Sequence, residues 1–363
     1  SILRKRYKDH STLYSVLSTY YFPSVIAAMN KDWKDQLTQI LDRLGKLETK
    51  YAGMGQDMLS YLDGLYYSNG LNYWEYTHLD SLLGLQTPRT PFKDEMIFII
   101  YHQITELMFK LCKHELLSLT EPQGDESEYL QLEMWQRRMG RVNNYFRHLS
   151  NSFDIMMTGM DMEEFRKFRM ALLPASGFQS VQFRQIEIMS TNLQNLIRAE
   201  DAPAGNDSIS ARYPFIYWKQ GGIDLETGTK TLTLREFENK YDESLVRLIE
   251  KFQTQNLAHL YQTAPPEVRE DESLQDQLRE YDQYVNVYWK LSHLSAAAKH
   301  LVRDGAEVDA TGGTNWRTFL PPRFQRVIFF PELWTAAERE EWGRAAVVKE
   351  FNKLVSQGWM KGE

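Results

Sequence analysis

The sequence predicts an all-α fold, or one that is mostly so, arranged as a single-domain helical bundle. Apolar residues recur at spacings of three and four along almost the whole chain, and the alternation that is typical of strands is scarce. Hydrophobic residues make up 42% of the 363 residues, which is enough to build a sizeable core. We expect one interruption, a small irregular or hairpin insertion near 200–235.

The first half of the chain shows the helical periodicity most clearly. Apolar residues at 31–50 recur at threes and fours, as on one face of an amphipathic helix. Asn72 is a suitable N-cap for a helix that the QTPRTP segment at 86–91 ends. The helices expected in this half of the chain lie at 31–50, 58–67, 73–86, 93–119, 127–152, 161–173 and 179–199.

The second half begins with a change of composition. Gly, Pro, Ser and Asp crowd residues 200–235, and TKTLTL at 229–234 is the one convincing strand-like alternation. Helical spacing then resumes, and we expect helices at about 235–257, 266–303 and 331–356. Residues 1–50 are interpreted as an N-terminal helical arm and residues 51–363 as the main domain.

Charge and cysteine content exclude several function classes. The formal net charge of −7 argues against a surface that binds nucleic acid. No apolar run approaches the roughly 20 residues that a membrane span requires. Cys112 is the single cysteine, so an intrachain disulfide or a cysteine-based metal cluster cannot form. A reducing, cytoplasmic location fits this cysteine usage best.

Two histidines lie on long apolar stripes. His102 shares its stripe with Phe98, and His293 shares one with Trp289 and with two alanines one turn away. Small side chains beside a histidine leave room for a flat group, as an axially ligated heme requires. A histidine on an apolar face is also typical of an ordinary helical core, and the spacing leaves both interpretations open.

Other catalytic sites find less support. A di-iron bundle needs two Glu-x-x-His motifs, and only Glu75–His78 has that form. No HExxH and no G-x-S-x-G motif is present. Arg169 lies in a cation-rich segment at 165–187. Its guanidinium either belongs to a solvated face or clamps a carboxylate with two hydrogen bonds.

Several long segments, taken together, carry a family resemblance. They are NYWEYTHLDSLLGLQ, DEMIFIIYHQITELMFKLCKHEL, FRKFRMALLPASGFQSVQFRQIE, YWKLSH and ATGGTNW, and they begin at residues 72, 94, 165, 288 and 310. The chain resembles the tryptophan 2,3-dioxygenase family, in a variant with an N-terminal arm and an altered glycine loop. In that loop, ATGGTNW replaces the more usual GTGGSSG and puts Trp316 where the family has glycine. Thr77 replaces an expected leucine, so the fine substrate preference stays open.

The resemblance implies a cofactor, heme b, and a set of site residues. His293 matches the axial ligand of the heme iron, and Trp289 lies one turn before it on the same helix. His102 matches the catalytic distal histidine, which hydrogen-bonds the indole N–H of the substrate. The other positions that match substrate-binding residues are Phe98, Phe165, Arg169, Leu172, Ser176 and Thr311. Tyr73 and Tyr76 match tyrosines that reach the pocket from a neighbouring subunit.

The activity that the resemblance implies is cleavage of the indole 2,3-bond of L-tryptophan by O2, giving N-formylkynurenine. The assembly that it implies is a homotetramer, a dimer of dimers, with the arm at 1–50 between subunits. No nucleic-acid or membrane partner is expected. Two alternatives remain at this point: a heme-dependent monooxygenase that acts on a tryptophan derivative, and a sensor that binds heme or tryptophan without turnover.

Overall fold

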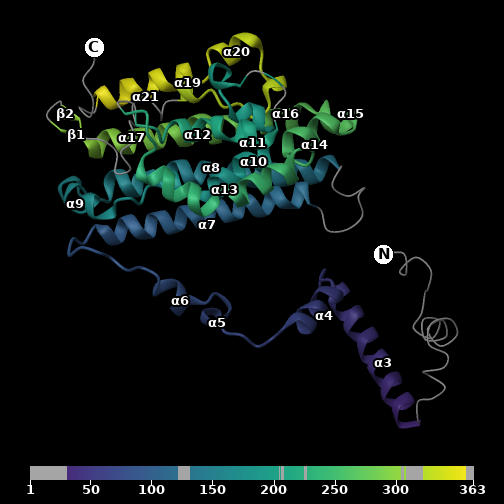
Figure 1. Cartoon of the computed structure of the whole chain (residues 1–363). Helices are drawn as coiled ribbons and strands as arrows, with labels where there is room; N and C mark the ends of the chain where they lie inside the picture. The colour runs from purple at the N-terminus through teal and green to yellow at the C-terminus, as the bar shows by residue number, and fades with distance from the viewer. Residues whose placement is uncertain are drawn as a thin grey trace. The chain divides into compact units, whose positions relative to one another are not determined.

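The computed structural model describes residues 31–121, 131–203, 205, 208–224, 227–303, 306–307 and 322–356. Nearly all of the regular structure in these ranges is helical, and the strands are one antiparallel pair of two residues each, β1 (Val302–Arg303) and β2 (Ala306–Glu307). From residue 86 onward, the helices stack as layers (Figure 1). The predicted all-α class is confirmed.

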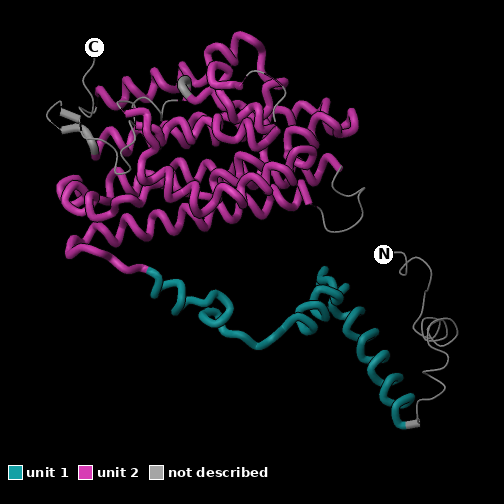
Figure 2. The backbone as a smooth tube through the Cα atoms, in the orientation of Figure 1, with its two compact units in different colours: residues 1–85 teal, residues 86–363 magenta. Residues whose placement is uncertain are grey.

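The chain divides into two compact units, Ser1–Leu85 and Gln86–Glu363, which Figure 2 colours separately. The described part of the first unit holds α3 (Lys31–Gly53), α4 (Met58–Tyr67), α5 (Tyr73–Tyr76) and α6 (Leu79–Leu83). The predicted single helix at 73–86 is therefore wrong. His78 interrupts it with a φ of 52°, in the left-handed region. The role of residues 1–50 as an arm between subunits stays a prediction.

Two long helices begin the second unit. They are α7 (Glu95–Thr120) and α8 (Leu132–Thr158), which pack against each other. The start of α7 is held by the buried carboxylate of Glu95, which accepts hydrogen bonds from the backbone of Arg89 and Thr90 at 2.7 Å each. The residues that α7 and α8 bury between them include Phe109, Leu116, Met139 and Phe146.

The chain then turns through shorter elements. These are α9 (Met162–Phe168), the 3₁₀ turns Arg169–Leu172 and Gly177–Gln179, and α10 (Val181–Ser190), followed by 3₁₀ turns at Leu193–Leu196 and Ala199–Asp201. α10 packs against α7 and against α13 (Leu232–Phe252). The predicted helix at 179–199 is thus about half as long as expected, because its C-terminal part forms 3₁₀ turns.

The irregular insertion near 200–235 is confirmed, but its hairpin is not. Between Ala199 and Thr231 lie α11 (Ile209–Arg212), a 3₁₀ turn at Tyr213–Phe215 and α12 (Tyr217–Gln220). Among the described residues of this region, the antiparallel pairing consists of two isolated bridges, Ile197 with Ile216 and Ile223 with Lys230. The TKTLTL alternation ends instead in a helix, because the Thr231 side chain caps α13 by accepting from the backbone of Leu234.

The remaining helices are α14 (Leu257–Thr263), α15 (Pro266–Arg269), α16 (Glu272–Gln283), α17 (Trp289–Leu301), α19 (Pro322–Gln325), α20 (Ala336–Glu340) and α21 (Arg344–Ser356). A π-helical turn, Tyr284–Tyr288, joins α16 to α17 without a break. α8 packs against both α16 and α17, and a 3₁₀ turn at Pro331–Leu333 precedes α20. The expected helix at 266–303 is therefore present only from Glu272 to Leu301, with one π-helical turn inside it. Asp271, in extended conformation, separates α15 from α16, and residues 302–303 belong to β1.

Candidate functional site

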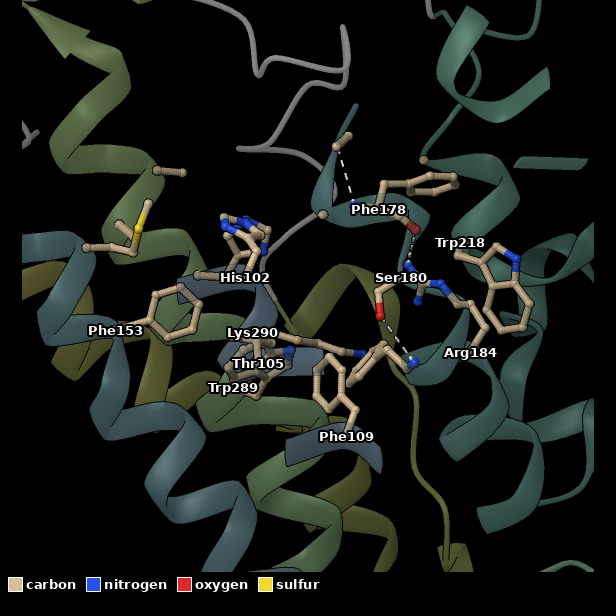
Figure 3. A pocket seen from close by; sticks show the side chains of 18 of the residues that line it. His102, Thr105, Phe109, Phe153, Phe178, Ser180, Arg184, Trp218, Trp289 and Lys290 are labelled. Atoms are coloured by element: carbon tan, nitrogen blue, oxygen red, sulfur yellow. Dashed lines mark hydrogen bonds between the residues drawn. The ribbon is translucent and has the colours of Figure 1, made fainter. Parts of the chain in front are cut away.

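The second unit contains a cavity of about 290 Å³. Its walls come from α7, α8, α9, α10, α12 and α17, so segments far apart in the sequence meet there. Most of the wall is apolar or aromatic, with Phe98, Phe109, Phe153, Phe178 and Trp289 among its members. Figure 3 shows His102 on one side of this cavity and Arg184 beside Trp218 on the other.

His102 is held in one tautomer by its own helix. Its Nδ1 lies 2.7 Å from the carbonyl oxygen of Phe98, which can only accept, so Nδ1 carries the proton. Burial lowers the pKa of His102 below its usual value, which keeps the ring neutral near pH 7. Nε2 is therefore left as a hydrogen-bond acceptor. The Phe98 ring, 4.1 Å away between centroids, packs against the imidazole.

His293 faces the same cavity from α17. Its side chain is exposed, and it lines the cavity. Desolvation by the surrounding protein and the neighbouring His102 lower the pKa of His293 to about 4, so the imidazole is neutral. Among the residues that the structure describes, none makes a hydrogen bond to this ring. A neutral imidazole with this freedom is the form that ligates iron.

The surroundings of His293 suit a flat, apolar group. Phe153 lies nearly parallel to the imidazole, at 6.0 Å between centroids and 21° between planes. Ala296 and Ala297, one turn further along α17, also line the cavity and add little bulk. Within the described ranges, no three His, Cys, Asp or Glu side chains group as they would around a bare metal ion. The donor set thus fits a planar cofactor bound through one histidine, as heme is.

His300 lies on the same cavity wall, two turns after His293. Its Nε2 donates to the carbonyl oxygen of Met156 at 2.9 Å, and its ring packs against Phe165. Burial lowers the pKa of His300, so this ring is also neutral at pH 7. Because its Nε2 is engaged with the backbone, His300 is a wall residue.

Arg184 and Lys290 form a polar side of the cavity that the sequence analysis did not assign to the site. Arg184 pairs with buried Glu187 at 3.0 Å, donates to the Tyr217 hydroxyl at 3.1 Å, and lies 5.0 Å from the Trp218 ring. Burial by itself lowers the pKa of Arg184, but Tyr217 and Glu187 raise it above its usual value. Burial lowers the pKa of Lys290 to about 8.

A weak signal for both cations was present in the sequence. Arg184 lies in the cation-rich segment at 165–187, where a solvated face was the ordinary interpretation. Lys290 lies within YWKLSH, three residues before His293. Neither pattern shows that the side chain is buried. The contribution of α12 had no signal, because the composition of 200–235 predicts a surface insertion, whereas Tyr217, Trp218, Gln220 and Gly221 line the cavity.

The structure brings together six of the predicted site residues. Phe98, His102, Phe165, Ser176, Trp289 and His293 all line the cavity. Arg169 is buried and Leu172 packs against the buried cluster that contains Phe165, but neither is among the described residues of the cavity lining. Their substrate-binding roles stay predictions.

The three other predicted positions are not among the described residues of the cavity lining. Thr311 lies outside the residues that the structure describes. Tyr73 and Tyr76 belong to the first unit, where their side chains are 71% and 74% exposed. Separately, none of the helices in the described ranges has the length and apolar character needed to cross a membrane.

Comparison with known proteins gives a consistent result. The profile of the family "Tryptophan 2,3-dioxygenase" matches residues 64–202. The tryptophan 2,3-dioxygenase of Ruegeria sp. (strain TM1040) is 29% identical over 288 residues, which cover 74% of this chain and 92% of the relative. That of Pseudomonas fluorescens is 28% identical over 287 residues, with the same coverage. A shorter match, to the enzyme of Polaromonas naphthalenivorans, reaches 38% identity over 127 residues, 35% of this chain and 43% of the relative.

The profile match includes His102, Phe165 and Arg169, and the long alignments cover about three quarters of the chain. Similarity of this extent accords with a helical fold that places two histidines on one apolar cavity. The chain is similar to the tryptophan 2,3-dioxygenase family, both in the segment that the family profile matches and over about three quarters of its length.

Proposed function

We propose that the protein is a heme-dependent dioxygenase that cleaves the indole 2,3-bond of L-tryptophan with O2 and forms N-formylkynurenine. The observation that carries the proposal is the placement of His102 and His293, from different helices, on one apolar cavity. Similarity to the family supplies the reaction class. The single cysteine is in keeping with a cytoplasmic location.

His293 would hold the heme through its neutral imidazole, with Trp289 and Phe153 as walls. Trp289 is itself fixed by Phe109 at 5.5 Å and by Phe153 at 4.9 Å between ring centroids. Heme, when bound, supplies the activation of dioxygen that allows both oxygen atoms to be added across the indole double bond. The aromatic walls exclude water from that chemistry.

His102 would orient the substrate. Its Nε2 is an acceptor in a neutral ring, so it can accept a hydrogen bond from the indole N–H. Phe98 and Phe165, whose ring centroids are 6.1 Å apart, would contact the indole, together with Leu172 and Ser176. These contacts fix the direction of the indole and leave the C2–C3 bond free to react.

The amino-acid end of tryptophan would bind to Arg169 and Thr311, as the family resemblance implies. A guanidinium and a carboxylate can share two parallel hydrogen bonds, which also sets the direction of the ligand. An indole without a carboxylate would leave that pairing unmade and bind more weakly, by about 2–4 kcal/mol.

The assembly that we propose is a homotetramer, a dimer of dimers, in which Tyr73 and Tyr76 of one chain enter the site of another. Apolar side chains exposed in the single chain support it. In the first unit, Leu65, Tyr66 and Tyr67 are 75%, 80% and 75% exposed. Such surfaces are typical of residues that a partner chain covers. A row of half-exposed residues on α7 has the same character: Met96, Ile100, Ile104, Leu107 and Leu111.

The test is turnover with isotopically labelled dioxygen. Heme-loaded protein is reduced, mixed with L-tryptophan and ¹⁸O₂, and the product mass is measured. Two labelled atoms in N-formylkynurenine support the proposal. One labelled atom identifies the monooxygenase alternative, and tryptophan binding without any product identifies the sensor; either result contradicts the proposal.

A further inference from the structure

A ladder of three buried polar side chains runs along the helix that carries His293. Asp282, Asn286 and Lys290 are four residues apart, and their exposed fractions are 0%, 1% and 5%. Asn286 donates from Nδ2 to Asp282 Oδ1 at 2.8 Å and accepts at Oδ1 from Lys290 Nζ at 3.3 Å. An asparagine suits this place because its amide donates to a carboxylate on one side and accepts from an ammonium on the other.

The Asp282 end of the ladder binds the C-terminal segment, residues 329–334. Asp282 accepts hydrogen bonds from the backbone N–H of Phe329 at 2.9 Å and of Phe330 at 3.2 Å, and from Trp334 Nε1 at 3.1 Å. Arg279, one turn earlier, adds a bond to the Leu333 carbonyl at 2.6 Å. Residues 329–334 are therefore fixed on the face of the helix that Asp282 defines.

The Lys290 end of the ladder reaches the cavity. Lys290 lines the cavity and lies 4.7 Å from the Tyr217 ring. His293 follows three residues later on the same helix. The contacts of the ladder thus join the C-terminal segment, the helix that carries His293 and the wall built by α12.

The π-helical turn 284–288 lies between the two ends. Its bond from the Trp289 N–H to the Tyr284 carbonyl spans five residues instead of four. In an unbroken α-helix, residues eleven apart such as Asp282 and His293 lie about 20° from each other around the axis, on one face. His293 would then point toward the C-terminal segment. One extra residue in a turn rotates everything after it by about 100°.

We propose that Asp282 and Asn286 are positioning residues, which hold the π-helical turn 284–288 in place and so set the direction in which His293 faces the cavity. Without their hydrogen bonds, the π-helical turn is less stable relative to a regular α-helix. Relaxation toward the regular helix then rotates His293 away from the cavity. Substitution acts on His293 through the helix, because neither side chain is a member of the cavity lining.

The part of this proposal that concerns heme rests on the function proposed above, and the experiment separates the two. Asp282→Asn keeps the shape of the side chain but places an N–H₂ group against N–H donors. Asn286→Leu removes the middle of the ladder and leaves the bonds of Asp282 to residues 329–334. Glu115→Gln is the matched control: Glu115 is a buried carboxylate paired with Arg138 at 2.6 Å, and it lies on α7 outside the cavity lining.

Two quantities are measured on the full chain: the affinity for hemin, and hydrogen–deuterium exchange of the amides at 289–301. We expect Asp282→Asn and Asn286→Leu to weaken hemin binding about tenfold and to accelerate exchange in that segment. Glu115→Gln is expected to lower the melting temperature and change neither quantity. If the ladder variants match Glu115→Gln in both quantities, the positioning role is overturned.

If the wild-type chain takes up no hemin, the proposed function fails, while the exchange comparison still decides the positioning role. If Asp282→Asn does not fold, Asn286→Leu decides it alone, because that variant leaves the C-terminal contacts intact.

Discussion

A single backbone carbonyl determines what His102 can do. Because the Phe98 oxygen accepts from Nδ1, the distal histidine presents an acceptor at Nε2. In the proposed function it would orient an N–H group of the substrate, since the neutral ring has no proton to give from Nε2. If the helix left Nδ1 without this acceptor, the proton could lie on Nε2, and His102 would then donate a hydrogen bond from that atom.

We therefore expect His102→Ala to keep its heme and to lose only part of its activity. One hydrogen bond contributes about 0.5–1.5 kcal/mol net, which corresponds to roughly a tenfold loss in kcat/KM. Steady-state kinetics and the heme absorbance check both statements. Complete loss of turnover with normal heme and tryptophan binding would show that His102 takes part in the chemistry.

His293→Ala is expected to bind little or no heme, because the other histidine on this wall, among the residues that the structure describes, is His300, whose Nε2 is bonded to the Met156 carbonyl. His300→Ala is the control, since the Nε2 of His300 is engaged with Met156. The absorbance of heme per protein chain after reconstitution separates the two variants. A His293→Ala protein with full heme and full activity would exclude the assignment of this ligand.

At the residue scale, the sequence was sufficient to predict site residues that lie within long family motifs. Phe98, His102 and His293 meet on one cavity as the resemblance implied. Arg184 and Lys290 were not assigned, because a cation in a sequence is normally solvated. Their burial arises from α12, which packs over them and belongs to no motif.

At the scale of elements, the insertion is held in place by a buried ion cluster. Lys219, which lies between the cavity-lining residues Trp218 and Gln220 of α12, contacts Glu238 at 2.9 Å and Asp242 at 2.7 Å. Its Nζ also lies 4.0 Å from the Tyr213 ring. The cluster attaches α12 to α13 and so keeps Tyr217 and Trp218 in the cavity wall.

Lys219→Met should destabilise the protein by about 3 kcal/mol at pH 7, because it leaves two carboxylates without their buried partner. Burial by itself raises the pKa of Glu238, but hydrogen bonds from Lys230 and Lys219 lower it below 4.5. The stabilisation by Glu238 is therefore present above pH 4.5 and is lost as the pH falls through the lowered pKa.

Urea unfolding at pH 7 and in acid tests this prediction, with exposed Lys240→Met as the control. The cost of Lys219→Met should be smaller in acid than at pH 7. An equal cost at both pH values, or an equal cost in the control, would contradict the role given to the cluster.

Element boundaries followed the sequence where periodicity was long and uninterrupted. α3 and α7 begin and end within a few residues of their predicted bounds. The break at His78 was missed because α5 and α6 bury no side chain, so no core pattern marks their ends. The π-helical turn was missed because Val285, Asn286 and Val287 are consecutive and all buried, which hides any change of period.

At the scale of the whole molecule, the proposed site takes residues from two chains. Arg169 would come from one subunit, and Tyr73 from its neighbour. Mixing Arg169→Ala chains with Tyr73→Ala chains should therefore restore part of the activity, since one site in each mixed pair then has both residues. The activity of the mixture is compared with that of each variant alone.

Subunit exchange must be shown independently, by mass spectrometry of the mixed assembly. Absence of rescue despite exchange would refute shared sites, as would a fully active monomer in solution. Composition and motifs predicted one helical bundle with an arm at 1–50, whereas the two compact units divide after Leu85. The QTPRTP segment at 86–91 indicates the end of a helix there, but the end of a helix does not by itself indicate a boundary between units.

The π-helical turn has a consequence for the history of this chain. A π-helical turn holds one residue more than the α-helical turn in its place, so insertion of one codon into a regular helix can create it. An alignment of related sequences should then show a one-residue gap between positions 284 and 288 wherever the acid at 282 is replaced by an apolar residue. Relatives that keep the acid should keep the full length. In that case, the number of residues between positions 282 and 293 would determine in which direction the heme-binding histidine points.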